Sequence, residues 1–221
     1  KQGPGTLTLA GSSDTPGPTT LNGGTVVLDY TLANASRLTP GTNATTALTL
    51  GGVDLQLKGG SYAQTLGSGG GTTIGSGQSR VRRTAGGTST IALGAITRNA
   101  TVGGVIDFAS GVASTTTGNT GGLLGGYGCA TVDGADWAVG GGPVTPLSAY
   151  DSFAVPGTDK NILLTGSGST AGTSVSTLKI VPAAPGESLT LGGLVTLSRG
   201  GLLFLGSEDY AITGGSLRGR T

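Results

Sequence analysis

The residues best suited to binding or chemistry are concentrated between Gly121 and Lys160. This segment holds the only tryptophan, Trp137, together with Asp133 and Asp136 close before it. Trp137 and Tyr150 are candidate stacking surfaces for a glycan, and the two aspartates are candidate ligand-binding residues beside them. The alternative is that Trp137 is an apolar anchor that packs the segment against its neighbours. We favour the anchor, because a unique tryptophan is usually packed.

A second group of functional candidates is basic. Arg80, Arg82 and Arg83 form a contact patch that could bind acidic polysaccharide, phosphate or a neighbouring subunit, or could simply be a solvated turn. The net charge is only +1 and no aromatic residues alternate with these arginines, so nucleic acid is not an expected partner.

Several kinds of catalysis are excluded or disfavoured by composition. The chain has no histidine, which removes imidazole bases, Ser-His-Asp triads and histidine-ligated zinc. Glu187, Glu208 and Asp209 are the candidates for a carboxylate pair that cleaves polysaccharide, yet nothing places a partner opposite them. The calcium-binding loop motifs are absent, so the aspartates are better explained as turn formers. We therefore predict no catalytic residue, no metal and no cofactor.

The elements that must position these residues are short β-strands. Apolar and small polar residues alternate in runs such as Thr6–Leu9, Val53–Leu57 and Leu189–Leu191, and glycine pairs separate the runs. Aromatic residues are 4% of the chain and Asn-Gly or Asp-Gly hairpin turns are scarce, while glycine is abundant at 46 residues. An all-β fold is expected, as a β-solenoid with a thin aliphatic core in preference to a β-sandwich.

The N-terminal segment, residues 1–28, carries a family resemblance. Residues 1–11 read KQGPGTLTLAG and residues 19–28 read TTLNGGTVVL, which resembles the autotransporter-associated β-strand repeat; residues 15–18 depart from its pattern. The stretch 125–138 looks like a segment common in the largest bacterial proteins of this kind, and the stretch 188–217 looks like their later coils. The resemblance implies a right-handed parallel β-helix at the bacterial cell surface or secreted from it, and it implies no specific activity.

These observations combine into one expectation. Residues 1–120 and 161–221 are predicted to form coils of one rod, and residues 121–160 an excursion or loop-rich insertion. The function expected is that of a non-enzymatic extracellular scaffold, a segment of a larger surface protein or filament, in end-to-end contact with further repeats or identical subunits. The alternatives are a glycan-binding adhesin, for which surface glycans are the partner, and a polysaccharide-cleaving enzyme. No stretch is apolar for long enough to insert into a membrane as a helix.

Overall fold

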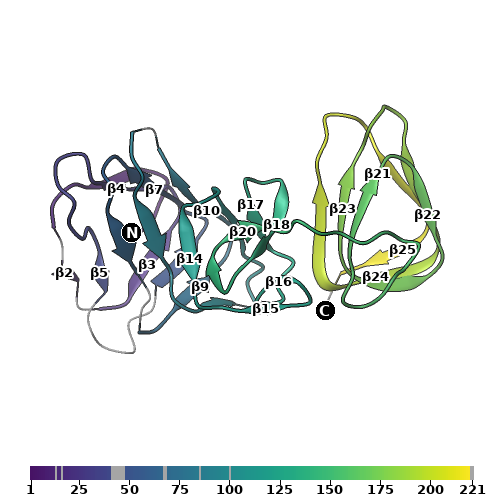
Figure 1. Ribbon diagram of the computed structural model, residues 1–221, viewed down its shortest axis with the longest axis horizontal. Helices are drawn as coiled ribbons and strands as arrows, with labels where there is room; N and C mark the ends of the chain where they lie inside the picture. The colour runs from purple at the N-terminus through teal and green to yellow at the C-terminus, as the bar shows by residue number, and fades with distance from the viewer. Residues whose placement is uncertain are drawn as a thin grey trace.

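The structure is a computed structural model that describes residues 1–12, 14–15, 17–40, 48–66, 69–84, 86–99 and 101–219. Within these ranges every regular element is a β-strand, which confirms the predicted all-β class. None of the described residues forms a helix that could cross a membrane. Two groups of strands, joined by an extended stretch, are visible in Figure 1.

The first group, here called the first stack, is a set of parallel ladders that the chain visits in a fixed order. Each strand pairs with the strand one turn later in the chain. The first ladder contains β1 (Thr6–Leu9), β4 (Thr25–Asp29), β7 (Asp54–Lys58), β10 (Gln78–Arg83), β13 (Val105–Phe108) and β17 (Ala130–Val132). The next side contains β2 (Asp14–Thr15) with β5 (Thr39–Pro40), and β8 (Ala63–Thr65), β11 (Thr90–Ala92) and β14 (Ala113–Thr115). The third contains β3 (Thr19–Asn22), β6 (Leu48–Gly51), β9 (Thr72–Ile74) and β12 (Ile96–Arg98).

The core of the first stack is built from columns of inward-facing side chains. Because alternate residues of a strand point to opposite faces, each parallel pairing places one inward residue directly over another. Leu55 pairs with Val26 on one side and with Val81 on the other, and all three are fully buried. The column continues through Phe108 to Val132. The predicted one-sided alternation of apolar residues is therefore the basis of the core.

Complete turns of the first stack differ in length, and the longest one contains a buried arginine. Thr25 of β4 pairs with Thr6 of β1 and with Asp54 of β7, and more residues separate Thr25 from Asp54 than from Thr6. Within that longer turn Arg37 is only 1% exposed and donates hydrogen bonds to the carbonyl oxygens of Asp29 (2.7 Å) and Ala33 (2.6 Å). The pairing of β4 stays regular on both sides although the two turns differ in length.

Short antiparallel strands come before and after β17, the last parallel strand of the first ladder. We call them the antiparallel cap: β15 (Asn119–Thr120), β16 (Leu123–Leu124), β18 (Asp136–Val139), β19 (Gly142–Pro143) and β20 (Thr145–Pro146). Strand β18 pairs antiparallel with β17, and β19 pairs antiparallel with β14. Strand β20 extends the edge by pairing with β18. The cap thus reverses the chain direction at the edges of two ladders.

A second stack contains β21 (Asn161–Thr165), β22 (Gly168–Thr170), β23 (Thr173–Val181), β24 (Ser188–Phe204) and β25 (Ala211–Arg218). All of its strand pairs are parallel. Register shifts between Val175 and Thr177 and between Leu191 and Leu194 divide the long strands into segments that lie on different sides. Its buried apolar residues form a cluster of their own, separate from that of the first stack.

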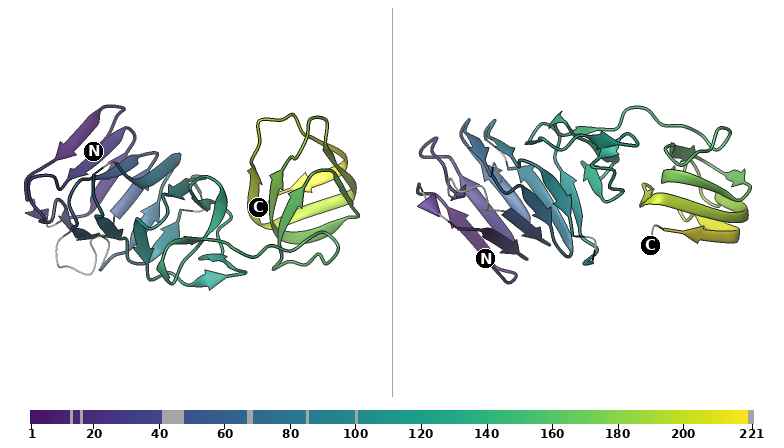
Figure 2. Two further views of the ribbon diagram at one scale, coloured as in Figure 1. Left: turned by 45° about the horizontal axis from the view of Figure 1, so that its top comes forward. Right: turned by 90° about the horizontal axis from the view of Figure 1, so that it is seen from below.

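The relation between the stacks bears on the predicted organisation of the chain. Both views of Figure 2 show β21–β25 as a body beside the end of the first stack. No strand of the first stack or cap pairs with a strand of the second stack among the described residues. The division at residues 120 and 160, with the second stack continuing the same rod, stays a prediction. Residues 147–160, here called the connector, contain no strand.

Candidate functional site

Trp137 lies where the cap meets the second stack. It is on β18, it is only 2% exposed, and it belongs to neither apolar core cluster. A methyl group built on Gly201 of β24 would lie 2.8 Å from Cη2 of the indole, so the ring edge is packed directly against that strand. The structure therefore places this side chain as a packing anchor and leaves almost none of it open for stacking on a glycan.

Asp136 and Tyr150 are brought together with a residue that the sequence did not suggest, Lys179 of β23. The Tyr150 hydroxyl donates to Oδ1 of Asp136 (2.9 Å), and the Lys179 ammonium pairs with the same oxygen. The Lys179 nitrogen also lies 5.1 Å from the centroid of the Tyr150 ring, within cation–π range. Burial, together with the hydrogen bond to Asp136, raises the pKa of Tyr150. The polar groups of this cluster satisfy one another.

Asp133 has a different role from Asp136. It is in the turn between β17 and β18 with a positive φ of 54°, a conformation that aspartate tolerates better than most residues. Its Oδ1 accepts the backbone N–H of Ser110 (3.0 Å). Among the described residues, no three His, Cys, Asp or Glu side chains are grouped so that they could hold a metal ion. The structure gives Asp133 the contacts of a turn residue.

The three candidate arginines lie on β10, and two of them, Arg82 and Arg83, have hydrogen-bond partners of their own. Arg82 makes two hydrogen bonds to Asp54 of β7, and Arg83 donates to the carbonyl oxygen of Gly111. Arg80 pairs in register with Asp54 and Asp107 along the same outward row. In the part of the chain that the structure describes, the guanidinium of Arg80 makes no hydrogen bond or salt bridge. Part of the basic patch is thus neutralised within the sheet.

A small groove brings members of both candidate groups together at the junction of the two stacks. We call it the junction groove; its volume is about 220 Å³. Its walls include Arg80 and Asp107 from the first ladder, Trp137 from the cap and Leu202 from β24. Cys129 lines it as well, and burial raises the pKa of its thiol to about 11. Arg80 and Trp137 are far apart in the chain, and only the stacking of turns makes them neighbours.

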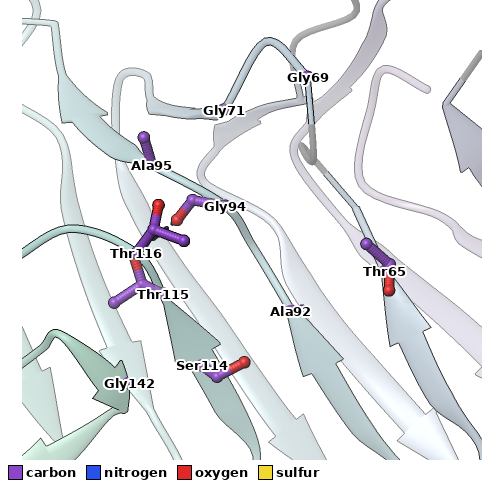
Figure 3. A pocket seen from close by; sticks show the side chains of 10 residues that line it. All are labelled: Thr65, Gly69, Gly71, Ala92, Gly94, Ala95, Ser114, Thr115, Thr116 and Gly142. Carbon is purple, nitrogen blue, oxygen red and sulfur yellow. Dashed lines mark hydrogen bonds between the residues drawn. The ribbon is translucent and has the colours of Figure 1, made fainter. Parts of the chain in front are cut away.

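A larger groove of about 470 Å³ runs across several turns of the first stack (Figure 3). Its floor includes the outward column Thr65, Ala92 and Ser114, which pair in register on β8, β11 and β14. Beside them Thr115 donates its hydroxyl hydrogen to the carbonyl oxygen of Gly94 (2.6 Å). Among the residues that the structure describes, the lining has hydroxyls and glycines and no charged side chain. Sequence reasoning missed this groove because its residues become adjacent only when the register is known.

The carboxylates considered for polysaccharide cleavage have local partners in the second stack. Glu187 accepts the backbone N–H of Ala183 (2.7 Å), and the Glu208 carboxylate accepts the hydroxyl of Ser207 (3.3 Å). Asp209 follows directly after Glu208 in the loop between β24 and β25. Neither of the two grooves described above is lined by Glu187, Glu208 or Asp209.

Comparisons with known proteins add one finding, at the start of the chain. Residues 1–28 match the family model described as passenger-associated-transport-repeat, in agreement with the resemblance seen in the same residues. No curated protein and no solved structure matches the chain. The matched segment spans β1 and β3 and reaches into β4, one full turn of the first stack. Residues 1–28 are therefore similar to a passenger-associated transport repeat.

Proposed function

We propose that this chain is a β-solenoid scaffold, a structural segment of an extracellular or cell-surface protein that is not an enzyme. The observation that carries the proposal is the inward column in which Val26, Leu55, Val81 and Phe108 follow one another through consecutive parallel strands. Such a column, together with the separate parallel ladders that the chain visits in a fixed order, is expected for turns stacked on one axis, as in a solenoid. The passenger-associated repeat at residues 1–28 supports the surface location.

The mechanism of such a scaffold is mechanical. Every internal rung is hydrogen-bonded to the rung before and the rung after it, while the apolar columns exclude water from the centre. Cleavage by a protease requires local opening, and internal rungs can open only by breaking ladders on both sides. A stiff, protease-resistant rod that displays its turns on the outside is the expected result.

The outermost rungs support the end-to-end partners in this proposal. Leu7 faces inward on β1 and is 38% exposed, whereas its column neighbour Val26 is fully buried. Ile212 on the last strand of the second stack, β25, is likewise 38% exposed, although its neighbour Leu189 on β24 is buried. One further rung, from the same chain or an identical subunit, would cover these side chains and pair the free strand edges.

The other two functions considered receive no such support. An adhesin acting through Trp137 needs an exposed aromatic surface, and that side chain is buried between the cap and β24. A polysaccharide-cleaving enzyme needs two carboxyl groups opposed across a cleft. Among the described residues that line the two grooves, Asp107 is the one carboxylate.

Electron microscopy of the native material, combined with labelling of intact source cells by a membrane-impermeant amine reagent, tests the scaffold proposal. We expect rods or filaments with the strand spacing of about 4.8 Å along their axis, and labelling of the protein on intact cells. Compact particles without that spacing, or a protein that is labelled only after the cells are lysed, would overturn the proposal.

A further inference from the structure

The two stacks are joined covalently by a segment that gives little rigidity by itself. The connector, residues 147–160, has no strand. Leu147 is bonded to Trp137 and Asp151 is bridged to Ile162, so the link between the stacks is the short segment between them, in which Ser148 and Ala149 are exposed. A strandless exposed segment of this kind allows relative motion of the units that it joins unless their surfaces hold them together. The contacts between the stacks therefore decide whether they move as one body.

The backbones of the two stacks approach closely at a pair of glycines. The N–H of Gly128 donates to the carbonyl oxygen of Arg199 on β24 (3.2 Å). A methyl group built on Gly128 would lie 2.5 Å from the nitrogen of Gly201, and one built on Gly201 would lie 3.0 Å from Cα of Gly128. Both positions thus need glycine if Trp137 is to keep its contact with β24.

A charge pair crosses the same junction. Asp136 belongs to the cap, Lys179 belongs to the second stack, and Tyr150 of the connector donates to the same carboxylate oxygen. Lys179 is only 8% exposed. A buried ammonium that loses its carboxylate is strongly destabilised in place, so the docked arrangement depends on this pair.

A third contact lies apart from the charge pair. Asn161, at the start of β21, is 6% exposed and donates through Nδ2 to the carbonyl oxygen of Gly121 (2.9 Å). Its Oδ1 accepts the hydroxyl of Thr177 on the neighbouring strand (2.8 Å), which fixes the amide orientation. The junction therefore has an aromatic anchor, a backbone contact, a buried ion pair and a buried amide.

We propose that this junction is a conformational device: a built intramolecular interface that holds the two stacks at one angle, and that becomes a hinge at the connector when the Asp136–Lys179 pair is broken. The scaffold proposal does not depend on it, because a rod can be jointed or stiff.

Cleavage of the connector in the full chain tests the proposal. A specific protease site is inserted between Ser148 and Ala149, both exposed, so that Asp151 and Lys160 stay in the same half, and the cut protein is analysed by size exclusion at micromolar concentration and moderate salt. We expect the two halves of the wild-type sequence to elute together. With Lys179→Gln we expect at least about tenfold weaker association, because Asp136 then lacks its buried cation.

Lys160→Gln is the matched control. It removes the same charge from the pair that Lys160 makes with Asp151 (3.0 Å), which lies within the connector and does not cross the junction. We expect its cut halves to stay together. Small-angle scattering of the uncut chains gives an independent readout: one narrow distribution for the wild type and Lys160→Gln, and a broader one for Lys179→Gln.

Separated halves from the cut wild type, or Lys179→Gln halves that associate as strongly as the wild type, would overturn the proposal. Circular dichroism of the uncut variant distinguishes undocking from unfolding, since undocking leaves the strand signal unchanged. If Lys179→Gln lowers that signal, Tyr150→Phe replaces it. This variant removes only the hydroxyl that donates to Asp136, and unchanged association in it would count equally against the proposal.

Discussion

Arg82 and Asp54, 28 residues apart in the chain, are joined across neighbouring strands by two hydrogen bonds. Nε of Arg82 is 2.9 Å from Oδ1 of Asp54, and Nη2 is 2.6 Å from Oδ2. These bonds are the main reason that the pKa of Asp54 is lowered, and burial opposes them. Lys58 pairs similarly with Asp29 one turn earlier, at 2.9 Å. The outward face of the first ladder thus carries ion pairs that connect consecutive turns.

The first prediction concerns acid stability. Hydrogen bonds from the hydroxyl and N–H of Thr31, followed by the bond from Lys58, lower the pKa of Asp29 from 3.8 to about 2. A carboxylate whose pKa is lower in the folded state than in the unfolded state stabilises the fold at pH values above its unfolded-state pKa. This stabilisation is lost as the pH falls toward the folded-state pKa. Unfolding free energy measured with urea should therefore be level above about pH 5 and fall between about pH 4 and about pH 2.

The variant Asp29→Asn should reduce that acid slope. Because Lys58 is half exposed, the pair contributes little, below about 1 kcal/mol after solvent screening. Asp209→Asn, in the loop after β24, is a control with the same chemical change. A slope in Asp29→Asn as steep as that of the wild type would contradict the assignment.

The second prediction concerns the spacing between turns. A methyl group built on Gly104 would overlap the carbonyl oxygen of Gly75 on the preceding turn, and backbone cannot yield as a flexible side chain can. Gly104→Ala should therefore lower the unfolding free energy by about 3 kcal/mol or more. Gly118→Ala meets no atom within 4 Å and should change it by less than about 0.5 kcal/mol. Equal midpoints in urea for the two variants would refute the close stacking.

The third prediction concerns the apolar column. Leu55 is fully buried between Val26 and Val81, so Leu55→Ala leaves a cavity and should cost about 2 to 5 kcal/mol. Leu32→Ala makes the same chemical change at a side chain that is 90% exposed, and its cost should be near zero. Thermal or urea unfolding of both variants measures the difference. A cost below about 1 kcal/mol at Leu55 would show that the column is not packed.

The fourth prediction concerns thiol reactivity. With the pKa of Cys129 raised to about 11, only about one thiol in a thousand is ionised at pH 8. The reaction with a chromogenic disulfide should be at least about 100-fold slower in the folded protein than in denaturant. A Thr97→Cys change in a Cys129→Ser background supplies an exposed comparison thiol on β12. Fast labelling of folded Cys129 would mean that the junction groove admits reagent and solvent to the sulfur.

How much of this structure can be predicted from the sequence depends on how far apart in the chain the interacting residues are. The alternation Thr6-Leu7-Thr8-Leu9 correctly predicts a strand and which of its residues face inward, because a strand's two faces follow from its own residues. The all-β class follows from many such local runs. The pairing of Leu7 with Val26 does not follow from them, because it depends on how many residues the intervening turn absorbs.

The candidate site shows the same difference between local features, which the sequence predicts, and contacts that are distant in the chain, which it does not. By residue type alone, Trp137 is more often a packing anchor than a ligand platform, and the sequence favours the anchor. What the anchor packs against is Gly201 of the second stack, which is far away along the chain. Asp136 and Lys179 are 43 residues apart, and no local pattern in the sequence links them.

The unequal turns have a consequence for the history of such chains. The first ladder passes from Thr6 to Thr25 through a short turn and from Thr25 to Asp54 through a longer one, while the rungs remain in register. The pairing therefore depends on the strands and not on the number of residues between them. Additional residues at a corner, such as those around Arg37, lie outside the ladder. Related proteins can gain or lose residues at these corners without a shift in the register of the strands. Similarity between distant relatives should then survive in the rungs while the spacing between them drifts.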